Sequence, residues 1–209
     1  MLNILIGTRN KYKAEEMTAF LGYIFGIKIY FLADTNINIK IEENQKTLKK
    51  NAEKKAIELS KLTDFYVLTS DSGIDIPGLG NKWDILRNQR IVGEFSSDLE
   101  KAYKLLELMK NLKGEERKAT NHFAMTLALK GNLLWSDQQI IERAYIIEEL
   151  PDREIPQYKW MSHVWYYPQY NKVLNKLNDK EKEELRIQAI GIKNSLRKKI
   201  EEILLLNRD

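Results

Sequence analysis

Cysteine is absent from the 209-residue sequence, which excludes disulfide bonds, thiolate catalysis and thiolate metal sites. Only two histidines occur, His122 and His163, and isolated histidines are more often structural than catalytic. Any bound metal ion must therefore be held by oxygen or histidine ligands. No window is apolar over the roughly eighteen residues that a membrane span needs, and the apolar start is too short for a cleaved leader. We expect a cytoplasmic protein without a membrane partner.

A large excess of one charge is also missing. The 34 lysines and arginines exceed the 30 acidic residues by only four, and both signs are interspersed along the chain. This is not the concentrated basic stripe of a nucleic-acid-binding protein, so we expect no direct contact with nucleic acid and favour a small anionic ligand. With 43% hydrophobic residues, the chain can bury a substantial core.

Hydrophobic periodicity predicts an α/β beginning, a β-rich middle and a closing helix. The predicted strands are residues 2–6, 28–32, 65–69, 122–129 and 143–150, with a turn at Gly131 and Asn132 between the last two. The predicted helices are residues 14–24, 47–62 with Thr47 as the cap, 98–112, and a last one that starts at Asp179. The segment 151–172, rich in aromatic residues and proline, is predicted to be a loop.

Three stretches place polar side chains at the ends of these elements. In "GTRNKYK", residues 7–13, hydroxyl, amide and ammonium groups lie between a strand and a helix, where α/β proteins bind phosphate. In "IEENQKTLKKNAEKKA", residues 41–56, Glu43 precedes a helix on which Asn51 and Lys55 share one face. In "VLTSDSGIDIPGLG", residues 67–80, the strand is predicted to stop so that Asp71 lies at its carboxyl end, before the flexible Gly73.

Each stretch also has a plain structural interpretation. The first is compatible with a solvated turn, the second with an exposed, capped helix, and the third with a turn stabilised by an aspartate side chain. Taken one at a time, these interpretations are favoured. The three stretches together, however, occur in the order and spacing of a known family.

The chain resembles the inosine triphosphate pyrophosphatase family over residues 1 to about 130. The family motif T-G-N-x-x-K is matched by Thr8, Asn10 and Lys13, with Arg9 in place of glycine. The motif E-E-T-G-x-T-F-x-E-N-A-x-x-K-A is matched by Glu42, Glu43, Thr47, Asn51, Ala52, Lys55 and Ala56. D-D-S-G is matched by residues 70–73, with Ser70 in place of an acid, and "NQRIVG" keeps Arg90 and Gly93 of S-A-R-Y-x-G.

This resemblance implies an α/β fold, elongated and two-lobed, with a central mixed sheet flanked by helices, in a single domain over residues 1–209. It also implies a homodimer that cleaves nucleoside triphosphates to monophosphate and pyrophosphate with Mg²⁺. On that basis the metal ligands are Glu43 and Asp71, and Asp71 is also the catalytic base. The phosphate- or substrate-binding residues are Thr8, Asn10, Lys13, Lys55, Ser72, Arg90 and Lys172.

The second half departs from the family pattern. The family has G-F-G-Y-D-P-x-F where this chain has "HVWYYPQY", and the S-H-R motif that contacts the purine has no counterpart near the last helix. Trp165, Tyr166 and Tyr167 are candidates for stacking on the base, although these rings could equally belong to the core or to a subunit interface. Because polar groups that read the base are missing, the choice of base is open.

Two functions follow. In the first, the protein is a Mg²⁺-dependent pyrophosphatase acting, slowly, on a non-standard purine such as ITP or dITP. In the second, it binds a nucleotide with little or no turnover and reports it to an effector protein, as a sensing subunit of a bacterial antiviral defence complex. The retained phosphate-binding pattern favours the first, and the exchange of an acid for Ser70 favours the second.

Overall fold

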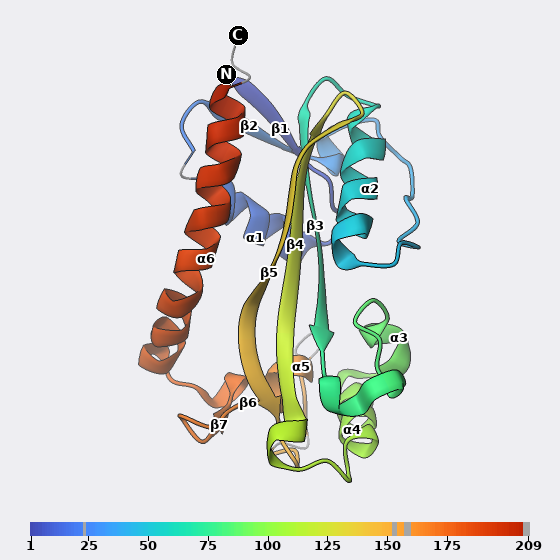
Figure 1. Ribbon diagram of the computed structural model, residues 1–209, viewed down its shortest axis with the longest axis vertical. Coiled ribbons are helices and arrows are strands. Elements are labelled where there is room, and N and C mark those ends of the chain that lie inside the picture. Colours follow the sequence, from blue (N-terminus) through green and yellow to red (C-terminus); the bar gives the residue numbers. More distant parts are fainter. Residues whose placement is uncertain (23, 152–153, 157–159, 207–209) are drawn as a thin grey trace. The chain divides into compact units, whose positions relative to one another are not determined.

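The computed structural model describes residues 1–22, 24–151, 154–156 and 160–206, which form two compact units (Figure 1). The first unit comprises Met1–Ser72, Phe123–Gln139 and Ile190–Asp209, and the second comprises Gly73–His122 and Ile140–Ala189. Each unit is therefore assembled from stretches that are distant in the sequence. That the whole chain is one two-lobed domain stays a prediction.

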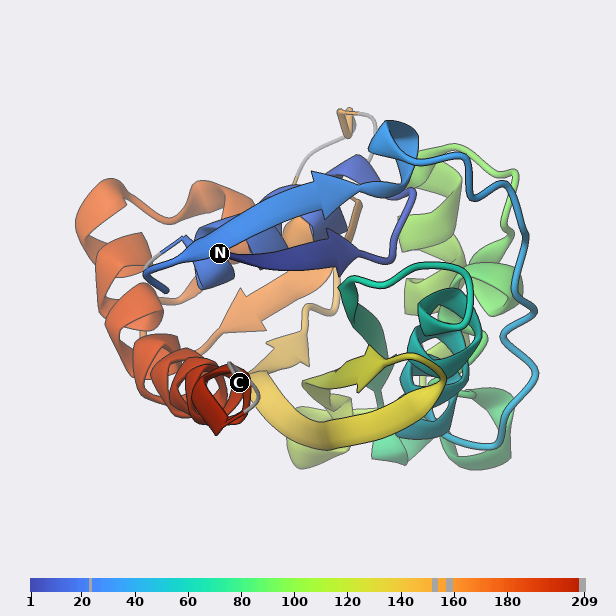
Figure 2. The same ribbon diagram turned by 90° about the horizontal axis from the view of Figure 1, so that it is seen from above.

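Seven strands form one mixed sheet in the order β2-β1-β3-β4-β5-β6-β7. Their bounds are Leu2–Ile6 (β1), Ile27–Phe31 (β2), Tyr66–Asp75 (β3), Lys118–Leu129 (β4), Asn132–Ile146 (β5), Trp165–Tyr167 (β6) and Lys172–Val173 (β7). The β1 strand pairs in parallel with β2 and with β3, and β1 and β2 are seen side by side in Figure 2. The β6 strand pairs antiparallel with β5 and β7. The predicted α/β class with a mixed sheet is confirmed.

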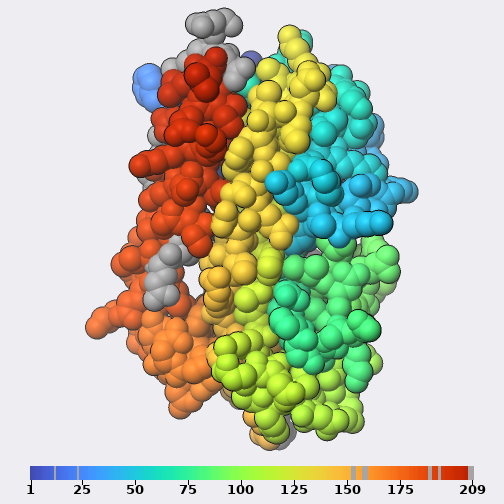
Figure 3. Space-filling model, viewed as in Figure 1, coloured from blue at the N-terminus to red at the C-terminus, as the bar shows by residue number. Residues whose placement is uncertain are grey.

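The described α-helices are Lys11–Leu21 (α1), Leu48–Ser60 (α2), Asn88–Val92 (α3), Asp98–Leu108 (α4), Trp160–Val164 (α5) and Asp179–Leu206 (α6). The predicted cap of α2 is present, because the Thr47 hydroxyl accepts a hydrogen bond from the backbone N–H of Lys50 at 3.1 Å. The closing helix also follows the predicted spacing, with Leu196, Ile200 and Leu204 buried. Figure 3 shows its last turns at the surface of the first unit.

In the first unit, α1 and α2 contact opposite faces of β3. The Thr69 hydroxyl donates to the backbone carbonyl of Ala52 in α2 at 2.7 Å. The next residue, Ser70, donates from its hydroxyl to the sulfur of Met17 in α1 at 3.4 Å. Successive side chains of a strand point to opposite faces, so Asp71 lies on the α2 side together with Thr69.

The core of the second unit contains two residues that the sequence had suggested for base stacking. Trp165 and Tyr167 are each only 1% exposed and pack in a cluster with Leu105 and Trp160. The Tyr167 hydroxyl donates to the carboxylate of Glu142. Burial is the largest cause that raises the pKa of Tyr167 above its ordinary value, and the Glu142 charge adds to it.

Three predicted elements were wrong in detail. The β3 strand was predicted to end around residues 69–71, but its backbone stays extended through Asp75. The segment 151–172 is not simply a loop, since it contains α5, β6 and the first residue of β7; residues 152–153 and 157–159 lie outside the described ones. The hairpin turn lies at Lys130 and Gly131, whose positive φ angles of 49° and 80° fit a two-residue turn.

Gly73 is required for space rather than for flexibility. A Cβ atom at this position would lie 2.3 Å from the carbonyl oxygen of Ile85, which is too close for any side chain. Its φ angle is not among the positive ones. The glycine of the Ser-Asp-Ser-Gly stretch therefore lets another segment of the second unit pass close to the strand.

Candidate active site

The site lies in the first unit, just beyond the point where the parallel pairing of β1 and β3 ends. The last paired residues are Ile6 and Leu68, so Asp71 belongs to the part of β3 that continues past β1. Asp71 thus occupies the carboxyl end of the parallel strands although β3 itself does not end there. This is the edge at which open α/β sheets bind ligands.

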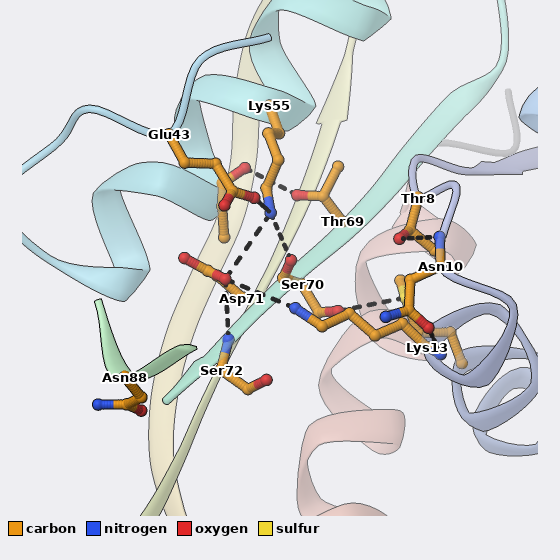
Figure 4. Close-up of polar contacts among 12 residues, drawn as sticks. Thr8, Asn10, Lys13, Glu43, Lys55, Thr69, Ser70, Asp71, Ser72 and Asn88 are labelled. Atoms are coloured by element: carbon orange, nitrogen blue, oxygen red, sulfur yellow. Dashed lines mark hydrogen bonds and ion pairs between the residues drawn. The ribbon is translucent and has the colours of Figure 1, made fainter. Parts of the chain in front are cut away.

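Two lysines from different helices approach the Asp71 carboxylate (Figure 4). Lys13 in the first turn of α1 has its Nζ 3.6 Å from Asp71 Oδ1, and Lys55 in α2 has its Nζ 3.9 Å from the same oxygen. The Asp71 side chain is only 8% exposed, and its Oδ1 also accepts the backbone N–H of Ser72 at 3.0 Å. The carboxylate is therefore held in place by its own strand and faces two positive charges.

Glu43 completes the cluster from the loop before α2. Its Oε1 lies 2.7 Å from Lys55 Nζ, and the same ammonium donates to the backbone carbonyl of Ser70 at 2.8 Å. The Glu43 carboxylate before α2 and the Lys55 ammonium on α2 therefore face one another. The loop that carries Glu43 is fixed by Lys54, which donates to the Glu42 carbonyl at 3.1 Å.

The start of α1 is organised by the predicted phosphate-binding residues. The Thr8 hydroxyl accepts the backbone N–H of Asn10 at 3.2 Å, and the Asn10 side-chain oxygen accepts the N–H of Lys13 at 3.2 Å. These contacts fix the backbone at the start of the helix, from which Lys13 extends to Asp71. The ordered helix start and the ammonium together form a suitable surface for an anion.

The donor set also fits a hard divalent cation. Glu43 and Asp71 supply carboxylate oxygens on either side of Lys55, and Mg²⁺ is typically bound by one or two carboxylates plus substrate phosphates and water. Among the described residues, no three histidine, aspartate or glutamate side chains lie close enough together to hold a metal ion by themselves. Phosphate and water would therefore have to supply most of the ligands.

With this geometry established, comparison with known proteins identifies the family. The model of the Ham1 family matches residues 4–195. The chain belongs to the Ham1 family. Its similarity to the dITP/XTP pyrophosphatase of Clostridium perfringens is 30% identity over 190 residues, which covers 87% of this chain and 89% of the relative. The dITP/XTP pyrophosphatase of Thermoanaerobacter pseudethanolicus is 29% identical over 209 residues, covering 96% and 100%.

A solved Ham1 structure has the same fold. The HAM1 protein from Coxiella burnetii superposes with a TM-score of 0.77 at 24% identity, over 97% of this chain and 100% of that one. The predicted membership of the inosine triphosphate pyrophosphatase family and the mixed-sheet fold are thus confirmed. None of the helices in the described part of this Ham1 chain is long and apolar enough to cross a membrane.

The other predicted residues of this Ham1 chain lie in the second unit, apart from Ser72, which is exposed on β3. Arg90 is exposed on α3, and Lys172 donates to both carboxylate oxygens of Glu181, at 2.7 and 3.0 Å. Of the three aromatic residues, only Tyr166 is partly exposed, and its hydroxyl donates to Asn171 at 2.7 Å. The burial of Trp165 and Tyr167 favours the interpretation that they belong to the core.

Two residues hold the Glu43 loop in a way that the sequence did not indicate. Asn51 is 3% exposed, and its side-chain oxygen accepts the N–H of Gln45 at 2.9 Å. Lys54 donates also to the side-chain oxygen of Asn44 at 2.9 Å. Asn51 had been noted for a family motif and for sharing a helix face with Lys55, but not for this positioning role. Nothing in the sequence distinguishes Lys54 from the other lysines of α2.

Proposed function

We propose that this chain binds a nucleoside triphosphate together with Mg²⁺ and hydrolyses it to nucleoside monophosphate and pyrophosphate. The observation that carries the proposal is the approach of two ammonium groups and two carboxylates in the first unit, from Lys13, Lys55, Glu43 and Asp71. Phosphoryl transfer needs this combination, because cations must stabilise phosphate charge while oxygen ligands hold the ion.

In this proposal the four residues divide the tasks, and Asp71 has two of them. Lys13 and Lys55 bind phosphate oxygens by charge-assisted hydrogen bonds. Asp71 takes the proton of the attacking water and, with Glu43, provides the carboxylates for Mg²⁺. When bound, the ion supplies Lewis-acid stabilisation of phosphate charge. The backbone N–H of Ser72 holds the Asp71 carboxylate in a fixed orientation, so that its free oxygen lone pairs point in a defined direction.

The substrate class rests on the relatives. Two of them, at 30% and 29% identity over most of the chain, are dITP/XTP pyrophosphatases, which supports a purine triphosphate with a non-standard base, such as ITP or dITP. As an enzyme the chain would act as a homodimer. Tyr166 is the aromatic residue that we retain as a base contact, because part of its side chain is exposed.

A nucleotide sensor is the second candidate, and Ser70 favours it. In the family motif this position is an acid, whereas here a hydroxyl that is bonded to Met17 points to the α1 side of β3. The exchange removes a negative charge from the residue next to Asp71, which weakens ion binding or activation of water. As a sensor the chain would bind nucleotide with slow or no turnover and report it to an effector protein of an antiviral complex.

One experiment separates the two functions. The purified protein is incubated with Mg²⁺ and a panel of ribo- and deoxynucleoside triphosphates, and both binding and pyrophosphate release are measured. Release from inosine- or xanthosine-type triphosphates at rates on the order of 10 per second would establish the enzyme and rule out the sensor. Tight binding without release would favour the sensor, and no binding would refute both.

A further inference from the structure

Lys55 has an unusual set of partners for a residue that is expected to bind phosphate. Its side chain is only 14% exposed, and its ammonium lies 2.7 Å from a Glu43 oxygen, 2.8 Å from the Ser70 carbonyl and 3.9 Å from Asp71. All three partners belong to the protein, and two of them are the carboxylates assigned above to the metal ion. The ammonium therefore already serves as the counter-ion of both carboxylates.

In this arrangement the Lys55 ammonium competes with a divalent cation for the same carboxylates. An oxygen that accepts a short bond from an ammonium is a poorer metal ligand, and two cations at one carboxylate repel each other strongly where solvent is partly excluded. A phosphate has the opposite effect, since its negative charge attracts Lys55 away from Glu43 and frees the carboxylate oxygen. Nucleotide and metal should thus favour each other's binding through the same lysine.

We propose that Lys55 is an exchangeable counter-ion that makes metal binding depend on nucleotide. While the ammonium is paired with Glu43 and Asp71, a free divalent cation binds weakly. When phosphate takes over the ammonium, the Glu43 carboxylate becomes available and Asp71 loses one of its two ammonium neighbours. This inference rests on the proposed function in one respect, namely that Glu43 and Asp71 are the carboxylates that hold the ion. It makes Lys55 a regulator of the site as well as a phosphate contact.

Lys13 does not take over this role, because its contact is different. Its Nζ is 3.6 Å from Asp71, and α1 rather than α2 carries it. Removal of Lys55 would therefore leave Asp71 with one nearby ammonium but remove the short ion pair of Glu43. Any change in metal affinity on removal of Lys55 should accordingly depend on Glu43.

The test measures Mn²⁺ binding, by calorimetry and by electron paramagnetic resonance, in protein without nucleotide. We compare wild type, Lys55→Met and Lys55→Arg, with Lys61→Met as the matched control. Lys61 forms an ion pair of the same 2.7 Å length with Glu58, but both side chains are about half exposed and lie outside the cluster. We expect Lys55→Met to bind Mn²⁺ on the order of tenfold more tightly than wild type. Lys55→Arg and Lys61→Met should bind it like wild type.

Unchanged or weaker Mn²⁺ binding by Lys55→Met would overturn the proposal, as would an equal gain in Lys61→Met. The gain should also disappear when Glu43→Gln is added to Lys55→Met, and its persistence would contradict the assignment of Glu43. If Lys55→Met does not fold, the Glu43→Gln variant tests the proposal by itself. Lys55 has lost its carboxylate partner in this variant, so the variant should bind inosine triphosphate several-fold more tightly than wild type in EDTA. Unchanged or weaker binding would refute the proposal.

These outcomes are distinguishable from failure of the proposed function. The Mn²⁺ measurement uses no nucleotide, so it reports on Lys55 even if no triphosphate is hydrolysed. Conversely, a wild-type protein that releases pyrophosphate while Lys55→Met shows no gain in Mn²⁺ affinity would retain the proposed function and lose only the counter-ion role.

Discussion

At the scale of single residues, Asp71 is the most exacting test of the site. Asp71→Asn keeps nearly the same shape but removes the charge and the ability to take a proton. We expect pyrophosphate release to fall about 100-fold or more, with an unchanged circular dichroism spectrum.

The matched control for Asp71 is Asp64→Asn. Asp64 is 91% exposed and lies 3.8 Å from Lys130, so the variant loses one carboxylate and one ion-pair partner at the surface. It should retain wild-type turnover. If Asp71→Asn remained as active as Asp64→Asn, Asp71 would be neither the base nor an essential metal ligand.

Lys13 tests the phosphate contact. Lys13→Ala should weaken the affinity for inosine triphosphate at least about tenfold, because a charge-assisted hydrogen bond to phosphate is lost, while the affinity for inosine stays unchanged. Titration calorimetry in EDTA measures both ligands. Lys11→Ala is the control, since Lys11 lies in the same helical turn, is 86% exposed and pairs with Glu15 at 3.9 Å. Equal losses for nucleotide and nucleoside would show that Lys13 does not bind phosphate.

Ser70 requires a change of expectation. From the sequence alone, restoring the family acid with Ser70→Asp should raise turnover. In the structure Ser70 is 2% exposed and faces the buried Met17 from α1, on the side of β3 away from Lys55. A carboxylate placed there would be desolvated, so we expect Ser70→Asp to lower the free energy of unfolding by about 1 to 3 kcal/mol. Urea denaturation measures this, with Ser72→Asp at the exposed neighbouring position as the control; equal stability of both variants would contradict it.

At the scale of elements, the loop between β2 and α2 carries Glu43, and hydrogen bonds hold this loop on both sides of that residue. Near its start, Arg9 donates from Nη2 to the Asn38 side-chain oxygen at 3.0 Å, and Arg9 replaces the glycine of the family motif. Near its end, Asn51 and Lys54 hold Gln45, Asn44 and the Glu42 carbonyl. Glu43 lies between these attachments, so its position depends on both.

We therefore expect Arg9→Ala to loosen this loop. The loss of the bond to Asn38, with the longer one to the Ile37 carbonyl at 3.5 Å, costs about 1 kcal/mol and should speed amide hydrogen exchange in residues 37–43 roughly fivefold while leaving α2 unaffected. Asn38→Ala should have the same effect, and the double variant no more than either single one. Additive effects of the two substitutions would show that the bond does not hold the loop.

Elements were predictable where a local signal determines them. Thr47 and the apolar spacing of α6 are such signals, and both elements formed as expected. The length of β3 was not predictable, because its continuation past Ser70 depends on strand neighbours rather than on its own polar residues. The same holds for β6, where Trp165 and Tyr167 are core residues because they belong to a buried cluster that includes Leu105 of α4, which is distant in sequence.

The family motifs named Glu43, Lys55 and Asp71 as site residues, and the structure brings these three side chains together. Their roles stay predictions, and their contacts could not be predicted. No sequence pattern could indicate that Lys55 pairs with Glu43 at 2.7 Å and lies next to Asp71, since this depends on how α2 packs on β3. The positioning role of Lys54 was equally invisible, because its partners are a backbone carbonyl and an amide in a loop.

At the scale of the whole molecule, stability should depend on alkaline pH in both units. Burial raises the pKa of Tyr66 in the first unit, and burial together with Glu142 raises the pKa of Tyr167 in the second. An acid whose pKa is higher in the folded than in the unfolded state stabilises the fold fully below the unfolded pKa. That stabilisation is lost as the pH rises above about 10, the ordinary tyrosine value, towards the folded pKa.

We therefore expect the free energy of unfolding to fall as the pH is raised beyond about 10, measured by urea denaturation at fixed ionic strength. Tyr167→Phe keeps the buried ring but removes the ionisable hydroxyl. It should cost about 1 to 2 kcal/mol at pH 7, where Glu142 loses its donor, and it should make the alkaline decline less steep. Tyr103→Phe is the control, because Tyr103 is 51% exposed, and its profile should coincide with that of wild type. An alkaline decline as steep in Tyr167→Phe as in wild type would mean that ionisation of Tyr167 does not limit the stability of the molecule at high pH.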